Sequence, residues 1–98
     1  MKINLQKSIK SFNAQEMNFA IDKEKTIPFT CKIAILEGLA NNKDLSFPKA
    51  KLGYEILETL KKSDELEIKF TDEEGFLIFE SVYKSFGLHV VGQVCFEQ

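Results

Sequence analysis

The feature that most limits the fold of this chain is the alternation of apolar and polar residues in short runs separated by polar turns. Alternation with a period of two suits a strand with one buried face, whereas an amphipathic helix repeats every three to four residues. The clearest run has apolar side chains at every second position: Ile27, Phe29, Cys31, Ile33 and Ile35. Pro28 cannot donate a ladder hydrogen bond, which places it near the start of this strand or on a sheet edge.

Similar patterns predict five further strands. They cover residues 2–12, where Ile3, Leu5 and Ile9 share one phase, and residues 17–22, 66–70, 76–86 and 88–96. Residues 71–75 end in glycine and read as a hairpin turn, and residues 38–45 read as a loop. Tight connections between neighbouring strands favour antiparallel pairing.

One segment instead has helical periodicity. Ser46 is a suitable N-cap and Pro48 is tolerated in a first turn, so a helix is predicted over residues 47–62. Its apolar stripe consists of Leu52, Gly53, Ile56, Leu57 and Leu60. A glycine within this stripe lowers helix propensity by about 1 kcal/mol, which a close approach to a sheet would offset.

The order of three strands, one helix and three strands (βββ-α-βββ) predicts an α+β protein. We expect a six-stranded antiparallel sheet arrangement with the long amphipathic helix packed on it. Ninety-eight residues suffice for one domain, spanning residues 1–98. Nine phenylalanines and no tryptophan suit the filling of its core.

The charges limit the class of partner. All thirteen basic residues are lysines, and arginine, the usual side chain for bidentate contacts to phosphate and bases, is absent. The net charge is −2, and seven acids against one lysine lie between Asp64 and Glu80. Such a segment repels nucleic acid and attracts a cationic partner, or it is a solvated face that aids solubility.

The residue patterns do not predict catalysis. The single histidine, His89, lies in a predicted strand without a nucleophile motif, and no spacing matches a phosphate-binding loop. Cys31 and Cys95 are 64 positions apart with no neighbouring metal ligands, so we expect free thiols, although the sequence leaves open whether they pair. Cys31 falls on an apolar phase and is expected in the core. We predict no cofactor, no metal and no catalytic residues.

The last two predicted strands, at residues 76–86 and 88–96, carry apolar residues on both phases. Either the N-terminal strands and the helix cover both faces of the C-terminal sheet, or one face is a partner surface with an apolar centre and an acidic rim. The candidate partner-binding residues combine the acidic segment with two polar side chains of the last predicted strand: Asp64, Glu65, Glu67, Asp72, Glu73, Glu74, Glu80, His89 and Gln93.

From the helix onward, the chain resembles the small immunity proteins that accompany bacterial toxins of the contact-dependent growth-inhibition and wall-associated type. The resemblance rests on AKLGYEILETLKK, ELEIKF, GFLIFESVY and GLHVVGQVCF, about half of the chain. It implies cytoplasmic residence, no catalysis and tight binding to the C-terminal domain of a cognate toxin, often a nuclease. The chain is short for that family and lacks its common tryptophans. No binding residue can be transferred individually, because immunity interfaces diversify with their toxins.

These observations favour an immunity protein that binds a cationic toxin domain. A basic nuclease is the expected kind of toxin, since nucleases hold phosphate. The alternative is a small-ligand-binding or dimerising α+β domain without catalysis, which would need a concave apolar pocket. An enzyme of unknown type is the least favoured interpretation. The N-terminal alternation argues against a signal peptide, and no apolar run is long enough for a membrane span, so we expect a cytoplasmic protein.

Overall fold

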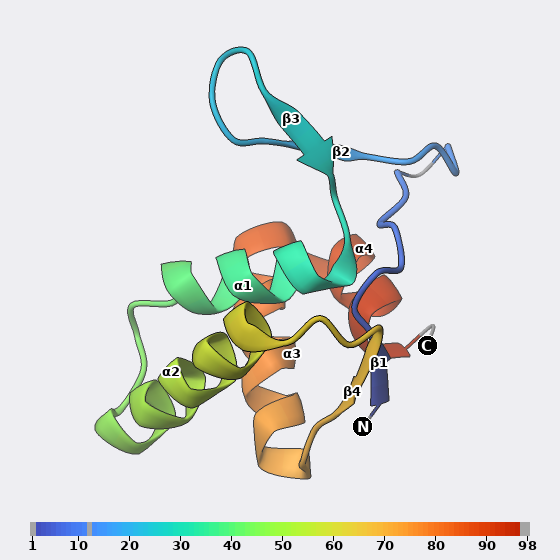
Figure 1. Cartoon of the computed structure of the whole chain (residues 1–98). Helices are drawn as coiled ribbons and strands as arrows, with labels where there is room; N and C mark the ends of the chain where they lie inside the picture. Colours follow the sequence, from blue (N-terminus) through green and yellow to red (C-terminus); the bar gives the residue numbers. More distant parts are fainter. Residues whose placement is uncertain (1, 12, 97–98) are drawn as a thin grey trace.

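Helices rather than strands build most of this protein (Figure 1). The computed structural model describes residues 2–11 and 13–96. Its elements are, in order, β1 (Lys2–Asn4), β2 (Asn18–Ala20), β3 (Thr26–Pro28), α1 (Cys31–Asn41), α2 (Phe47–Lys62), β4 (Glu67–Lys69), α3 (Asp72–Phe86), α4 (Leu88–Val91) and a π-helical segment, η1 (Gly92–Phe96). The α+β class holds, but the six-stranded arrangement is wrong, because the described residues form only two small two-stranded sheets.

The clearest predicted strand is mostly a helix. Only Thr26–Pro28 is extended, and Thr30 then caps α1, its hydroxyl accepting a 3.4 Å hydrogen bond from the amide of Ile33. The buried residues of α1 follow a helical spacing: Cys31, Ala34, Ile35, Gly38 and Leu39. The alternation of Cys31, Ile33 and Ile35 is therefore incidental, and α1 also takes up the first residues of the predicted loop.

The predicted hairpin turn at residues 71–75 is the start of α3. Thr71 and Glu74 form a capping box, in which the Thr71 amide donates to Glu74 Oε1 (2.8 Å) and the Glu74 amide donates to the Thr71 hydroxyl (3.2 Å). Three acids lie in the first turn, where their negative charges interact favourably with the positive end of the helix dipole. The helix ends at Gly87, whose φ of 83° is a value that glycine adopts more readily than other residues.

The last predicted strand is also helical. Residues 88–96 form α4 and η1, and they bury Val90, Val91, Gln93 and Val94. Apolar residues on both strand phases, at positions 76–86 and 88–96, thus reflect helices that bury one side rather than a sheet covered on two faces.

The predicted helix over residues 47–62 is confirmed as α2. Its buried residues are Gly53, Ile56 and Leu60, while Leu52 and Leu57 are partly buried. The helix packs on other helices rather than on a sheet. A Cβ added at Gly53 would meet side chains of Leu39 on α1, Leu77 on α3 and Leu45 in the connection between α1 and α2.

The N-terminal strand predicted over residues 2–12 is extended only at its start. β1 pairs antiparallel with β4, with Ile3 opposite Ile68, and the predicted apolar phase is confirmed because Ile3, Leu5 and Ile9 are fully buried. Phe12, at the end of this prediction, lies outside the described residues.

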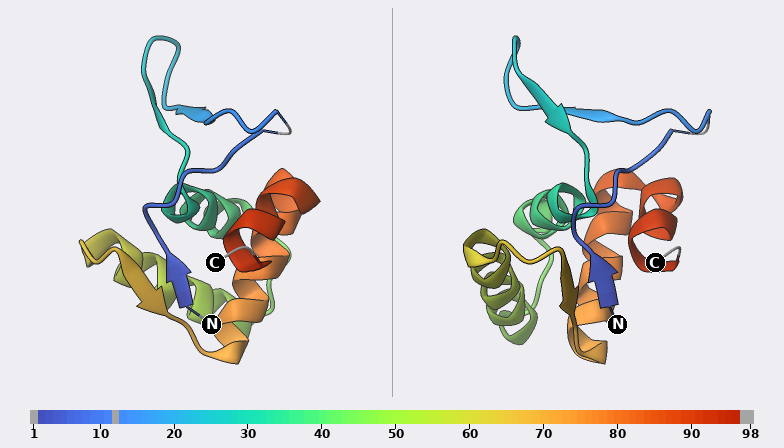
Figure 2. Two further views of the ribbon diagram at one scale, coloured as in Figure 1. Left: turned by 90° about the vertical axis from the view of Figure 1, so that its right-hand side faces the viewer. Right: turned by 45° about the vertical axis from the view of Figure 1, so that its right-hand side comes forward.

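The strands predicted at residues 17–22 and from residue 26 onward form the short β2–β3 hairpin. Phe19 lies opposite Ile27, and Pro28 lies on a strand of a two-stranded sheet, which is necessarily an edge. The hairpin stands away from the helices in every view (Figures 1 and 2). Its base is joined to the N-terminal segment, since Ile9 donates to the Phe29 carbonyl (2.7 Å) and accepts from the Met17 amide (3.0 Å).

The helices meet most closely where α1 crosses α3. A Cβ added at Gly38 would lie 3.1 Å from the carbonyl carbon and oxygen of Ser81 and from the Cα of Val82. These are backbone atoms of α3, which cannot rotate away as a flexible side chain can. Glycine therefore sets the separation of the two helices at this point.

This crossing gives a matched pair of alanine substitutions. Gly38→Ala gains about 1 kcal/mol of helix propensity, but it should destabilise the protein by about 1–3 kcal/mol net because the backbone of α3 must move. Gly53→Ala meets only side chains at 3.5–3.8 Å, so it should be neutral or stabilising by up to about 1 kcal/mol. Urea unfolding of both variants measures the difference. Equal stabilities would contradict the close crossing.

Candidate functional site

One face of α3 carries exposed aromatic side chains. Phe76 is 77% exposed, and Phe79 and Tyr83 follow it at spacings of three and four residues, with their rings stacked at 6.4 Å between centroids. Asp72 precedes Phe76 by one turn, so these four residues form one helical stripe. It lies opposite the buried side of α3, which includes Ile78, Ser81 and Val82.

A hollow opens beside this stripe, between α3 and the C-terminal segment. It has a volume of about 490 Å³ and is lined by Asp72, Gly75, Phe76, Phe79, Cys95 and Phe96. Phe96 is 68% exposed, and its ring meets that of Phe79 edge-on, with 5.7 Å between centroids. Three aromatic rings and one carboxylate therefore converge on a space that no basic residue lines among the described residues.

A second, smaller hollow lies on the other side of Phe76, between α2 and α3. It has a volume of about 260 Å³, and it is lined by Pro48, Lys49, Leu52, Glu73, Phe76, Leu77 and Glu80. Phe76 contributes to both hollows and therefore forms the ridge between them. We call this ridge, the two hollows and their acids the α3 surface.

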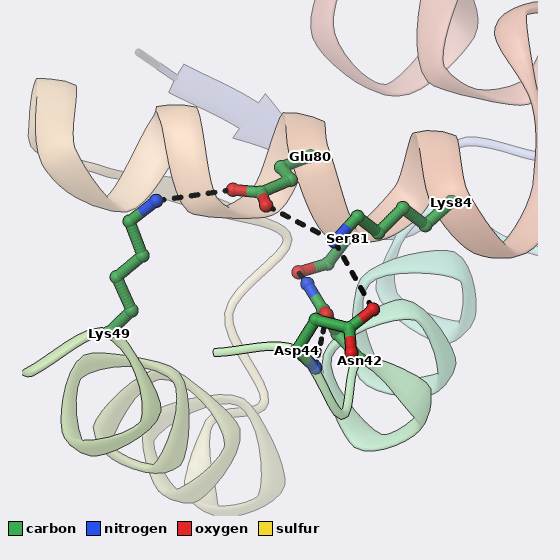
Figure 3. A network of polar contacts seen from close by, with 6 residues as sticks. All are labelled: Asn42, Asp44, Lys49, Glu80, Ser81 and Lys84. Atoms are coloured by element: carbon green, nitrogen blue, oxygen red, sulfur yellow. Dashed lines mark hydrogen bonds and ion pairs between the residues drawn. The ribbon is translucent and has the colours of Figure 1, made fainter. Parts of the chain in front are cut away.

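Glu80 is neutralised within the protein. Its carboxylate pairs with Lys49 of α2 (3.6 Å) and Lys84 of α3 (3.4 Å), and Lys84 also pairs with Asp44 (3.8 Å) (Figure 3). Asn42 anchors the same connection between α1 and α2 by donating to the buried Ser81 hydroxyl (3.0 Å). These side chains are partly exposed, so each ion pair contributes little, but together they hold the connection against α3.

The nine predicted partner-binding residues lie in three places. Asp72, Glu73, Glu74 and Glu80 are on α3, although Glu74 is engaged in the capping box. The exposed Asp64 and Glu65 lie in the connection after α2, and Glu67 on β4 pairs with Lys2 (3.5 Å). His89 and Gln93 lie in the C-terminal segment.

His89 and Gln93 hold the N-terminal segment. The side-chain Oε1 of Gln93 accepts a hydrogen bond from the backbone amide of Lys10 (2.7 Å), and its Nε2 donates to the backbone carbonyl of Lys10 (2.8 Å). The side chain thus bonds the Lys10 backbone as a neighbouring strand would. His89 Nε2 lies 2.6 Å from the same carbonyl, which can only accept, so this hydrogen bond needs a proton on Nε2. Gln93, a candidate partner-binding residue, is buried, with 6% of its surface exposed.

The aromatic residues of the α3 surface were missed because phenylalanines were expected in the core. Phe47, Phe76 and Phe96 are instead 84%, 77% and 68% exposed. The available signal was the spacing of Asp72, Phe76, Phe79 and Tyr83, which aligns them only when residues 72–86 are read as a helix.

The two thiols differ in burial. Cys31 is fully buried, as predicted, whereas Cys95 is partly buried beside the larger hollow, and both are free. Burial, with a smaller contribution from the charge of Cys31, raises the pKa of the Cys95 thiol to about 11. A thiol of this kind is protonated at neutral pH and is a poor nucleophile.

Among residues 2–11 and 13–96, no group of three or more His, Cys, Asp or Glu side chains is placed to hold a metal ion. No helix in that part of the chain combines the length and apolar character needed to cross a membrane.

Comparison with known proteins does not identify a family. No protein-family model matches the sequence, and neither the curated proteins nor the solved structures include a significant match. The α3 surface must therefore be interpreted from its own chemistry.

The Gln93 contacts predict a specific loss of stability. Gln93→Leu leaves the Lys10 amide without its acceptor, which should cost about 1–3 kcal/mol and speed hydrogen exchange at that amide. Gln15→Leu, at an exposed glutamine, is the control and should change neither quantity. Unfolding in urea and amide exchange measured by NMR provide the test. Unchanged exchange at Lys10 in the Gln93 variant would contradict the assigned contact.

The raised pKa predicts how Cys95 reacts. In the folded protein, alkylation by iodoacetamide should accelerate about tenfold per pH unit up to a plateau near pH 11, because the thiolate is the reactive form. Cys31 should remain unlabelled, which the Cys95→Ser variant tests directly. A plateau near the ordinary thiol pKa of 9.0, or equally rapid labelling of Cys31, would contradict these environments.

Proposed function

We propose that this chain is a non-catalytic binding protein that neutralises a cationic protein domain, in the manner of the bacterial immunity proteins it resembles. The observation that carries the proposal is Phe76, a large apolar side chain 77% exposed on a ridge between two hollows. Exposed aromatic side chains grouped on one surface are typical of protein interfaces. The proposed role places the protein in the cytoplasm with its producer's own toxin.

The charge of the α3 surface favours a cationic partner. Asp72 and Glu73 are exposed on the first turn of α3, and no ion pair engages them within the described part of the chain. Glu80, by contrast, already pairs with two lysines. The first turn therefore supplies an acidic rim beside an aromatic centre, which would speed association with a basic nuclease domain and oppose binding of nucleic acid.

Salt-dependent association tests this proposal. Asp72→Ser with Glu73→Ser should slow association with the toxin domain encoded beside this gene and weaken its salt dependence, measured by surface plasmon resonance at two ionic strengths. Glu74 stays intact because it caps α3. Asp64→Ser with Glu65→Ser removes the same charge from the connection after α2 and is the matched control. No binding by the unmodified protein, or equal effects of both double variants, would contradict the proposal.

A second candidate is a small-ligand-binding protein, which the larger hollow supports. Its volume of about 490 Å³ is in the range of ligand pockets, and its lining is mainly apolar. An uncharged apolar dye that binds tightly and competes with no protein partner would favour this candidate. Displacement of a weakly bound dye by the toxin domain would favour protein binding.

A further inference from the structure

We propose that the larger hollow of the α3 surface is the anchor site for an arginine side chain of the protein partner. This inference rests on the proposed function and names the group that the surface recognises. An arginine combines an apolar stem, a flat guanidinium that stacks on aromatic rings, and a charge that pairs with a carboxylate. The hollow offers a counterpart to each of these parts.

The aromatic part of the site is formed by three rings. Phe76 and Phe96 are largely exposed, and the ring of Phe79 meets that of Phe96 edge-on at 5.7 Å. Cys95 adds an apolar, protonated sulfur to the lining, since burial raises its pKa to about 11. A guanidinium is more weakly hydrated than an ammonium, so it loses less on entering such a surface.

The charged part of the site is Asp72, one helical turn before Phe76. Its carboxylate is exposed and lines the hollow, and no lysine shares that lining within residues 2–11 and 13–96. The positive end of the α3 dipole opposes cation binding here. It is equivalent to only about half a positive charge, whereas the first turn carries three carboxylates. The net field at the mouth of the hollow is therefore negative.

The neighbouring hollow shows why the larger one is favoured. There the acid Glu80 is paired with Lys49, which itself lines that hollow. The other acid of that hollow, Glu73, shares the lining with the same lysine, so a partner arginine would meet a positive charge there, whereas Lys49 does not line the larger hollow. Lysine is a weaker ligand for the larger hollow because its ammonium is strongly hydrated and cannot stack on a ring.

Single-residue probes test this site on the full chain. N-acetyl-arginine methylamide, followed by ¹⁵N NMR, should shift the amides of Gly75, Phe76 and Cys95 with a Kd on the order of a millimolar. The lysine analogue should bind more weakly and the leucine analogue more weakly still. Equal binding of the arginine and leucine analogues, shifts elsewhere, or no shifts would overturn the inference.

Matched variants locate the contact. Asp72→Asn should weaken arginine binding about fivefold to tenfold, and Phe76→Ala should weaken it about threefold. The controls are Glu55→Gln, at an exposed acid of α2 that lines neither hollow, and Phe47→Ala, at an exposed phenylalanine that also lines neither hollow. Both controls should retain the affinity of the unmodified protein. An Asp72→Asn variant with the affinity of Glu55→Gln would overturn the assignment.

The test separates this inference from the proposed function. If a toxin domain binds the α3 surface with the predicted salt dependence but the arginine probe does not bind, the anchor site is wrong and the function stands. If the probe binds with the predicted variant pattern but no cationic protein does, the anchor stands and the proposed function is wrong.

Discussion

The close crossing of α1 and α3 is the contact on which the rest of the structure depends. Gly38 lets α1 approach the backbone of α3 near Ser81, where any larger residue would be 3.1 Å from backbone atoms. Apolar side chains on both helices are buried, and Ile35 and Ile78 are fully buried. The connection that follows α1 is held to the same part of α3, since Asn42 donates to Ser81.

Because one side of α3 is committed to this packing, its opposite side must face outward. Asp72, Phe76, Phe79 and Tyr83 lie on that outward side, and the C-terminal segment brings Phe96 alongside. The protein could have covered this stripe with another element, yet Phe76 and Phe96 remain largely exposed. Exposure of aromatic rings at a fixed, hollowed position is the physical basis of the proposed binding role.

The polar residues divide between holding the fold and facing outward. Glu74, Glu80, His89 and Gln93 each make contacts within the protein, in a helix cap, an ion-pair network or the clamp on Lys10. A residue type and its place in the sequence do not distinguish these uses, because Glu73 and Glu74 are adjacent and only one of them caps α3. The assignment of acids to a binding rim therefore required the structure.

The sequence by itself determined the α2 helix, the buried phase of the N-terminal strand and the burial of Cys31. For the first two, a local pattern agrees with the final environment: an apolar stripe of period 3.6, or the alternation of Ile3, Leu5 and Ile9. Cys31 is buried as expected, but on a helix and not on the predicted strand. The sequence also contained a signal for the start of α3, the capping box of Thr71 and Glu74, but the glycine that follows them, Gly75, favoured a hairpin turn instead. Short apolar runs fit a buried helix and a buried strand equally well. Only tertiary packing decided between these possibilities, because α1 and α3 bury their apolar sides against each other and a strand would expose half of each run.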